Sequence, residues 1–474
     1  MNSRKKAFYT EITVCVGIFI FLLAWMVIQP FSVSPDEHMK YQIIEYLVEY
    51  GVLPHGGDEA IRHEIWGISY AFNPILSSML SVPFVKVTSF FTASRTDLII
   101  AARLVNVLLG TATAFLSLRI GRRLFKDGAK WLFTALVMLL PGTLFLFSYV
   151  NNDGLALFST ALIILMWVRA LQEGWDLKTC IGLAIGISIC MLSYYNAYGV
   201  VLCSVIFFVM TVIKGQRKMD WQFLLKRGTI ITGIVLLLAG WWFVRSYIIY
   251  DGDFLGMRTS SQYAEMYAQE SFKPSQRWVF ARTGMSIWKM LLYVPGEWQH
   301  NWLGTVLVSF VGTFGYLTEF MPSILSKIYI SFFGVGMAGS LLTIKSDFLT
   351  LNKDLIYEKT KPVGREHIIV KMMRKRSEWN KTVIFNWCML GTIIIPVGLL
   401  LYYAYYNEFQ AQGRYLMPGI IAIMYFVTCG YNNLLDKLIK SEKMRSRLYL
   451  AATVMVVIGA LYTYVAVFAP LYIR

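Results

Sequence analysis

The chain has 474 residues, of which 57% are hydrophobic and only 15% carry a charge, and its mean hydropathy is positive. Soluble domains carry roughly 25% charged residues, so this composition excludes an ordinary soluble protein and indicates one that resides in the bilayer. The net charge of +16 does not indicate nucleic-acid binding, because the basic residues gather in short segments between apolar runs.

Twelve apolar runs follow one another along the chain, and most match the roughly 20 residues that a helix needs to cross a ~30 Å hydrocarbon core. The first run follows Arg4, Lys5 and Lys6 and has no small-residue cleavage site, so we expect a retained signal-anchor. The runs cover residues 11–29, 74–92, 97–118, 131–150, 154–171, 177–194, 197–213, 228–249, 322–344, 383–406, 414–434 and 447–469.

Charge indicates how many of these runs cross the membrane. If all twelve crossed from a cytoplasmic N-terminus, the segment 345–381 would lie outside with its ten Lys and Arg residues, against the positive-inside rule. The run 74–92 contains Pro83, Lys86 and several serines, which is typical of an interfacial or re-entrant helix on the outer side. Without that run, four basic segments become cytoplasmic: 119–130, 214–227, 345–381 and 437–447.

The predicted fold is therefore an all-α polytopic membrane protein that forms one domain over residues 1–474, with about 11 transmembrane helices. We expect its N-terminus in the cytoplasm and its C-terminus outside. Two long external segments, 30–96 and 250–321, hold most of the polar chemistry, and the first should carry amphipathic juxtamembrane helices.

An acidic pair, Asp36-Glu37, lies in the first external segment, just after the first span. Pro35 favours a helix start, and acidic residues in a first turn are ordinary because they complement the helix dipole. At the water boundary, a partly desolvated carboxylate also suits general-base work, and the neighbouring carboxylate could bind a divalent cation. His38 either supports such a site or faces solvent.

Two later pairs of residues are expected at the same side of the membrane. Asn152 and Asp153 occupy a helix-to-helix corner, where they either cap the next helix or converge on Asp36. Arg414 and Tyr415 lie at the outer mouth of a late span. There the arginine either reaches lipid headgroups or clamps a lipid-linked phosphate.

The external loop 250–321 is rich in aromatic residues and contains Arg258 and Arg282. Tryptophan and tyrosine are expected at membrane interfaces whatever the function, although their faces also stack on sugar rings. Arginines bind phosphate oxygens bidentately, so both are candidates for phosphate contact.

In this order, the motifs resemble the GT-C superfamily of membrane glycosyltransferases, which includes protein O-mannosyltransferases and the lipid A aminoarabinose transferase. The family pattern is a first helix, an external loop that opens with an acidic pair and carries surface helices, an Ala-Arg-Leu helix and a second acidic corner. The chain matches it with Pro35-Asp36-Glu37, Ala102-Arg103-Leu104 and Asn151-Asn152-Asp153. It is most similar to a bacterial branch whose further motifs are here Ser309 to Gly315 and Gly413 to Pro418.

The resemblance implies transfer of a sugar, with inversion, from a polyprenyl-phosphate donor such as an undecaprenyl-phosphate sugar to a cell-envelope glycan, lipid or polymer. It implies Asp36 as the base, Glu37 as a helper or metal ligand, and Asp153 as a residue that positions the acceptor or completes a metal site. Arg414 leads the candidates for the leaving phosphate, ahead of the arginines of the 250–321 loop. A divalent cation, Mg²⁺ or Mn²⁺, stays open, and the expected location is a bacterial plasma membrane.

Three other functions stay open at this point. A transporter or lipid-linked sugar flippase would place charges near the bilayer midplane and often shows internal repeats, whereas Arg103 is the main charge within a span here. A polysaccharide polymerase or ligase would share the outer-face chemistry but use a diphosphate-linked donor. A non-catalytic scaffold would leave Asp36 and Arg414 dispensable.

Overall fold

The structure is a computed structural model that describes residues 3–214, 218–292, 301–349, 351–363 and 366–473. Within this part of the chain, eight helical segments are long and apolar enough to cross a membrane. They are α1 (Ser3–Ile28), α4 (Arg95–Leu124), α7 (Asp153–Glu173), α16 (Lys381–Tyr406) and four composite segments: α10 (Trp221–Val235) with η5 (Leu236–Gly240) and α11 (Trp241–Ile249), α15 (Ser323–Ser340) with η8 (Leu341–Thr343), η10 (Gly413–Gly419) with α17 (Ile420–Leu438), and α18 (Glu442–Tyr462) with η11 (Thr463–Phe468) and α19 (Ala469–Tyr472).

Shorter apolar helices complete the bundle: α5 (Ala129–Met138), α8 (Leu177–Met191), η3 (Tyr195–Ala197) with α9 (Tyr198–Thr211), and α14 (Trp302–Gly312). Three of them, α5, α8 and α9, lie in predicted spans. The helix α14 lies instead in the loop 250–321, and its Trp302, Val306 and Phe310 side chains are buried. The polytopic all-α fold is confirmed, while the count of eleven spans stays a prediction.

The connections carry the remaining elements. The helical ones are α2 (Glu37–Tyr50), α3 (Leu76–Ser89), α6 (Pro141–Leu146), α12 (Met257–Tyr267), α13 (Ile287–Leu292), η1 (Glu59–Ile61), η2 (Tyr70–Phe72), η6 (Glu270–Phe272), η7 (Phe280–Thr283) and η9 (Lys345–Leu349). The strands form three antiparallel pairs: β1 (Ile213–Lys214) with β2 (Lys218–Met219), β3 (Thr313–Phe314) with β4 (Glu319–Phe320), and β5 (Leu351–Val363) with β6 (Glu366–Trp379). The pair β5–β6, which the sequence did not predict, occupies the basic segment 345–381.

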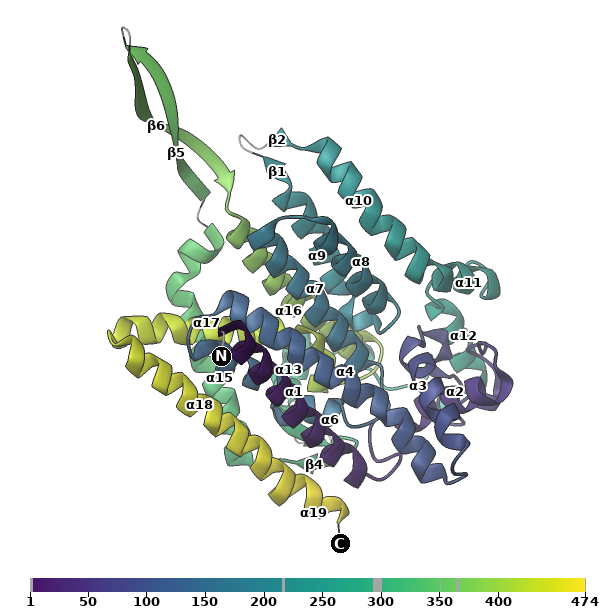
Figure 1. The fold of residues 1–474 in the computed structure, drawn as a ribbon. Helices are drawn as coiled ribbons and strands as arrows, with labels where there is room; N and C mark the ends of the chain where they lie inside the picture. The colour runs from purple at the N-terminus through teal and green to yellow at the C-terminus, as the bar shows by residue number, and fades with distance from the viewer. Residues whose placement is uncertain (1–2, 215–217, 293–300, 350, 364–365, 474) are drawn as a thin grey trace.

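The long helices run between two distinct ends of the bundle. In Figure 1 the β1–β2 and β5–β6 pairs lie at the top, and the N-terminus and the turn between α17 and α18 lie on the left, whereas α2, α3 and α12 lie on the right and the C-terminus lies at the bottom. At the first end, Glu11 of α1 is buried against Arg119 and Arg122 of α4. The basic segments that were predicted to share one side of the membrane therefore share one end of the molecule.

The run 74–92 forms only the 14-residue helix α3. At 1.5 Å per residue this helix is about 21 Å long, which is short of the ~30 Å hydrocarbon core. It packs on the start of α4, where the Ser81 hydroxyl donates a hydrogen bond to the Ala102 carbonyl at 3.0 Å. These features agree with a helix that lies beside the bundle and does not cross the membrane.

The run 131–150, predicted as one continuous span, is broken into two short helices. The helix α5 ends at Met138, and α6 begins at Pro141, which lacks the N–H that a continuous helix would need there. After α6 the chain is non-helical until α7 begins at Asp153. Irregular backbone at this depth is tolerated where it lines a cavity within the protein, which directs attention to residues 141–153.

Single-cysteine labelling checks the arrangement of the two ends. Gln262→Cys lies on α12 and Lys126→Cys in the turn after α4, and both native side chains are exposed. In a variant without the six native cysteines, a membrane-impermeant thiol reagent applied to intact cells should label Gln262→Cys and spare Lys126→Cys. Labelling of both positions, or of Lys126→Cys alone, would contradict the predicted sidedness.

Candidate functional site

The acidic pair lies where the chain turns from α1 into α2. Asp36 has φ 63° and ψ 3°, a left-handed conformation that is uncommon outside glycine. It stands at the N-cap position of α2, but its side chain makes no capping hydrogen bond. Strained conformations of this kind cluster at functional sites. The carboxylate of Asp36 is therefore directed to other partners, and simple capping does not explain it.

Glu37 is completely buried and paired with Arg103 of α4. The guanidinium binds the carboxylate through two hydrogen bonds of 2.7 Å, and the backbone N–H groups of Ser32 and Val150 donate to it at 3.2 and 3.0 Å. Both carboxylate oxygens thus have two donors each. The remaining N–H groups of Arg103 donate to three carbonyl groups at the end of α1, those of Met26, Gln29 and Pro30.

This network differs from the role that the sequence suggested for Glu37. Its oxygens are already saturated by Arg103 and two backbone amides, so little capacity is left for a metal ion or for a proton from a substrate. The side chain instead ties together α1, α2, α4 and the residues that precede α7. Glu37 and Arg103 are therefore positioning residues of the site.

Asp36 forms an ion pair with Arg414, a residue 378 positions further along the chain. The Arg414 Nη2 lies 2.6 Å from the Asp36 Oδ2 and also donates to the Tyr415 hydroxyl at 3.1 Å. Burial acts to raise the pKa of Asp36, but the Arg414 and Lys40 charges and the hydrogen bonds from Arg414 and Tyr70 outweigh it and hold this pKa below its ordinary value. Asp36 is consequently a carboxylate at neutral pH.

At the corner before α7, Asn151 serves the start of the helix, whereas Asn152 and Asp153 make or offer other contacts. The Asn151 side chain accepts a hydrogen bond from the Gly154 N–H at 2.9 Å, so it serves the start of α7. Asn152 accepts a hydrogen bond from Lys40 and donates to the Ser193 carbonyl at 3.1 Å. Asp153 is buried, and its Oδ1 is enclosed without a hydrogen bond to any residue that the structure describes. Asp153 therefore has an acceptor atom available for a ligand.

Two further kinds of side chain belong to the site and were missed by the sequence analysis. Lys40, one turn after Asp36 in α2, is buried with its ammonium 4.8 Å from the centre of the Tyr70 ring. Tyr70, Tyr149 and Tyr194 surround the charged groups, and burial raises the pKa of Tyr70 well above its ordinary value. The spacing of Asp36 and Lys40 could have indicated that the two side chains lie on the same side of a helix. The tyrosines come from separate loops, so no sequence spacing could have indicated them.

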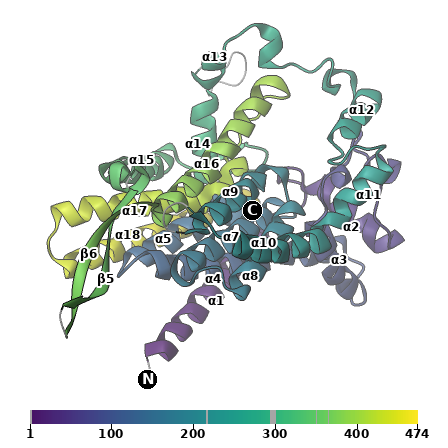
Figure 2. The same cartoon turned by 90° about the horizontal axis from the view of Figure 1, so that it is seen from above.

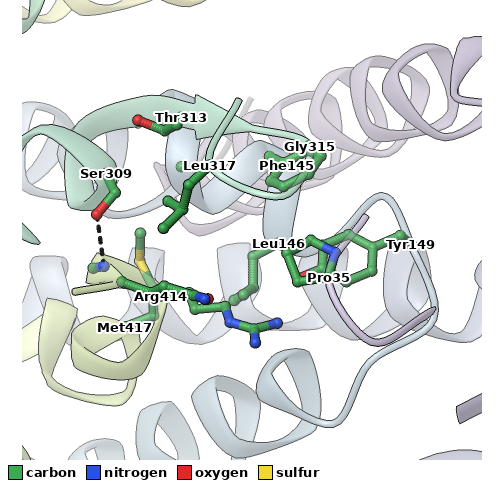
Figure 3. Close-up of a pocket in the computed structure, with 13 residues that line it drawn as sticks. Pro35, Phe145, Leu146, Tyr149, Ser309, Thr313, Gly315, Leu317, Arg414 and Met417 are labelled. Atoms are coloured by element: carbon green, nitrogen blue, oxygen red, sulfur yellow. Dashed lines mark hydrogen bonds between the residues drawn. The ribbon is translucent and has the colours of Figure 1, made fainter. Parts of the chain in front are cut away.

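A pocket opens beside Arg414. Figure 3 shows the Arg414 side chain extending toward the side of the pocket where Leu146, Pro35 and Tyr149 lie. Three of the sequence motifs meet here: the Pro-Asp-Glu motif, the segment Ser309 to Gly315 and the segment Gly413 to Pro418. The first contributes Pro35 to the wall, the second contributes Ser309, Thr313 and Gly315, and the third contributes Gly413, Arg414 and Met417. Most of the other lining side chains are apolar: Phe145, Leu146 and Leu317.

The backbone at Gly413 determines where Arg414 can lie. A Cβ atom at this position would stand 2.1 Å from the backbone nitrogen of Phe310 in α14, so only glycine allows the approach. The Gly413 N–H donates to the Ser309 hydroxyl at 2.8 Å, the contact drawn in Figure 3. This contact fixes η10 on α14. The Nε and Nη1 of Arg414 are enclosed and make no hydrogen bond of ordinary geometry to described residues.

Three predicted site residues are not brought to this place. Arg258 and Arg282 are exposed and donate to loop carbonyls, Arg258 to Asp251 and Arg282 to residues 274–277. They belong to the segment around α12 and α13, which Figure 2 shows as an arch beside the bundle. His38 is half-buried with its ring 6.0 Å from that of Phe31 and makes no recorded bond to Asp36.

Three solved structures share this fold. The apo oligosaccharyltransferase of Archaeoglobus fulgidus has a TM-score of 0.55 at 14% identity, over 97% of this chain and 55% of that one. AglB of A. fulgidus with an inhibitory peptide and a dolichol-phosphate gives 0.54 at 12% identity, over 99% and 56%. The A. fulgidus oligosaccharyltransferase complex with Zn and sulfate gives 0.51 at 13% identity, over 94% and 52%.

These similarities show the fold, which is that of a GT-C-like polytopic membrane protein, as the sequence predicted. The chain spans about half the length of the solved proteins that it matches. It belongs to the family described as "Predicted membrane protein (DUF2142)", whose profile matches residues 62–424 and so includes Asp153 and Arg414. A comparison with curated protein sequences gives no match.

Replacing Arg103 by methionine should destabilise the protein strongly. It would leave Glu37 buried without its partner, and breaking a buried pair in this way costs about 3–5 kcal/mol. The measurement is the free energy of unfolding in mixed micelles. Arg95→Met is the control, because its pair with Glu45 is exposed at 60% and 43% and should contribute at most about 1 kcal/mol. Equal losses in the two variants would contradict the positioning role.

Proposed function

We propose that this protein is a GT-C glycosyltransferase of the bacterial plasma membrane. It transfers a sugar from a polyprenyl-phosphate donor to a hydroxyl group of a cell-envelope glycan, lipid or polymer on the outer face. One observation carries the proposal: enclosed but unpaired donor atoms of Arg414 and an unpaired acceptor atom of Asp153 belong to the same charged site as Asp36. A ligand that bears both an anionic phosphate and hydroxyl groups would satisfy both kinds of atom.

Arg414 is suited to hold the phosphate of the donor. Its enclosed Nε and Nη1 atoms are donors that make no hydrogen bond of ordinary geometry to described residues, and a guanidinium binds phosphate oxygens bidentately where water is scarce. The adjacent cavity is lined by Phe145, Leu146 and Leu317, which suit the first apolar part of a lipid carrier, and the enclosed Thr313 hydroxyl adds a further donor without a partner. Tyr415, whose hydroxyl receives a hydrogen bond from Arg414, holds that guanidinium in place.

Asp36 is suited to act as the general base. It accepts the proton of the acceptor hydroxyl while the oxygen forms a bond to the anomeric carbon of the sugar. The bond between that carbon and the phosphate oxygen breaks, and its electron pair leaves on the phosphate, whose charge Arg414 stabilises. When the phosphate shares Arg414, the cation that lowers the pKa of Asp36 is partly neutralised, and the carboxylate becomes a stronger base.

Other residues of the site position these groups. The unpaired Oδ1 of Asp153 would accept a hydrogen bond from a sugar or acceptor hydroxyl, and Asn152 holds Lys40 beside it. Glu37 contributes through its pair with Arg103 and not through contact with substrate. His38 is assigned no role in the transfer.

Asp36→Asn should abolish most of the transfer. Removing a positioned general base costs roughly 10²–10⁴-fold in rate, while the amide preserves the size of the side chain. The assay uses proteoliposomes, a panel of polyprenyl-phosphate sugars and a cell-envelope acceptor fraction, and it measures release of polyprenyl phosphate. Asp251→Asn, an exposed aspartate that also has a positive φ, is the matched control and should keep wild-type activity. Full activity of Asp36→Asn would refute its role as the base.

Arg414→Ala should weaken binding of the donor lipid. The loss of charge-assisted hydrogen bonds worth about 1.5–3 kcal/mol corresponds to a roughly 10- to 150-fold higher Kd for polyprenyl phosphate. Arg414→Lys should recover only part of the affinity, because an ammonium group cannot bind bidentately. Arg258→Ala and Arg282→Ala serve as controls, and unchanged binding by Arg414→Ala would argue against this phosphate site.

A further inference from the structure

Lys40 is a charged residue in an unusual place. Its side chain is only 5% exposed, although lysine is almost never buried unless it is paired. The ammonium donates a hydrogen bond to the Asn152 side-chain oxygen and faces the ring of Tyr70 at 4.8 Å. These neutral partners cannot by themselves justify a buried positive charge.

Two carboxylates supply the missing compensation. Lys40 interacts electrostatically with Asp153 and with Asp36, which approach it from α7 and from the start of α2. Burial holds the pKa of Lys40 below its ordinary value; Asp153 and Asp36 act in the opposite direction and offset part of this effect, and the Arg414 charge adds to the lowering. The hydrogen bond to Asn152 places the ammonium at the corner that carries Asp153, and Lys40 lies one helical turn after Asp36.

The four ionisable groups balance one another. Two acids, Asp36 and Asp153, face two bases, Lys40 and Arg414, so in their charged forms the group has no net charge. Glu37 forms a closed pair with Arg103 and adds no net charge. The acids of this cluster already interact with Lys40 and Arg414. A divalent cation would add two positive charges to a cluster without net charge, and burying such a charge is costly.

The available ligands also fail to suit such a cation. A structural Zn²⁺ site takes about four protein ligands, mostly Cys, His, Asp and Glu, whereas Mg²⁺ and Mn²⁺ need free carboxylate oxygens and fill the rest of about six positions largely with water. Over the ranges that the structure describes, no group of three or more of these residues is placed to hold a metal ion. The oxygens of Glu37 are saturated, and Oδ2 of Asp36 is bound by Arg414. While Lys40 and Arg414 attend the two remaining acids, Asp36 and Asp153, the site therefore does not fit a divalent metal.

We propose that the ammonium group of Lys40 takes the place that a divalent cation would occupy between Asp36 and Asp153, so that this site works without a bound metal. Lys40 is then a positioning residue that keeps both carboxylates ionised and in place. A similarly folded oligosaccharyltransferase was solved as a complex with Zn and sulfate, so the fold itself does not prevent metal binding. This role belongs to the proposed transferase site, but it can be tested without any transfer reaction.

The test is a gain of metal binding when Lys40 is removed. The full chain is purified in detergent, stripped with EDTA and titrated with Mn²⁺, and bound metal is followed by electron paramagnetic resonance and by the shift of the unfolding temperature. The wild-type protein should bind no stoichiometric Mn²⁺. Lys40→Met leaves two uncompensated acids, and it should bind one Mn²⁺ per chain with an affinity raised by about tenfold or more. Adding Asp153→Asn should abolish this gain.

Matched variants separate the charge of Lys40 from its packing. Lys40→Arg retains the charge and should behave as the wild type does, and so should Lys86→Met, which removes an exposed lysine from α3 at the same end of the bundle. A lysine that only fills space would give Lys40→Met a lower unfolding temperature with no response to Mn²⁺.

Two outcomes would overturn the inference. The first is a folded Lys40→Met protein that binds no Mn²⁺. The second is stoichiometric Mn²⁺ binding by the wild type that Asp153→Asn removes, and this outcome is decisive even if Lys40→Met does not fold. Neither depends on transfer activity, so a failed glycosyltransferase assay would leave the role of Lys40 standing, and a metal-binding wild type would leave the transferase proposal standing.

Discussion

Glu37 and Arg103 form an ion pair that water does not reach, and the rest of the site is assembled around it. The pair holds the end of α1, the start of α2, the middle of α4 and the backbone at Val150 through six hydrogen bonds. Burying two charges is expensive, and an apolar pair of similar size is often as stable. An apolar pair, however, could not fix the positions of its neighbours in this way. The planar guanidinium makes hydrogen bonds in fixed directions, and these specify where each carbonyl and carboxylate must lie. Asp36 immediately precedes Glu37 in the chain, so this network also fixes the position of Asp36.

The two adjacent carboxylates thus differ in burial and in hydrogen bonding. Glu37 has all its hydrogen bonds satisfied, whereas Asp36 is 25% exposed and shares one oxygen with Arg414 in a place that a ligand can reach. The sequence shows an acidic pair at a water boundary but cannot show which member is enclosed, because the answer depends on Arg103, 66 positions later in the chain. The same limit applies to Lys40, whose partners Asn152 and Asp153 are more than a hundred residues away.

Hydropathy and charge were sufficient to predict most of the bundle, because a bilayer forces long apolar helices and loop charges then group the helix ends. The failures have a common cause. Pro141 breaks a run that is predominantly apolar, and one face of α14 is buried although its run is too short to cross a bilayer. In both places the protein itself provides the apolar surroundings, so hydropathy cannot distinguish contact with lipid from contact with neighbouring helices. Arg258 and Arg282 bind backbone carbonyls of their own loop, a contact that the sequence pattern could not indicate.

Asp36 and Arg414 are 378 positions apart, so the site can form only late in the synthesis of the chain. A ribosome delivers Asp36 near the start of synthesis and Arg414 only after most of the helices have entered the bilayer. Glu37 can meet Arg103 early, so the first loop can reach its final shape while the other half of the charged centre is still untranslated. A chain that stops before η10 would contain a folded acidic loop without the cation that completes it. Assembly of the bundle is thereby coupled to the appearance of a competent site.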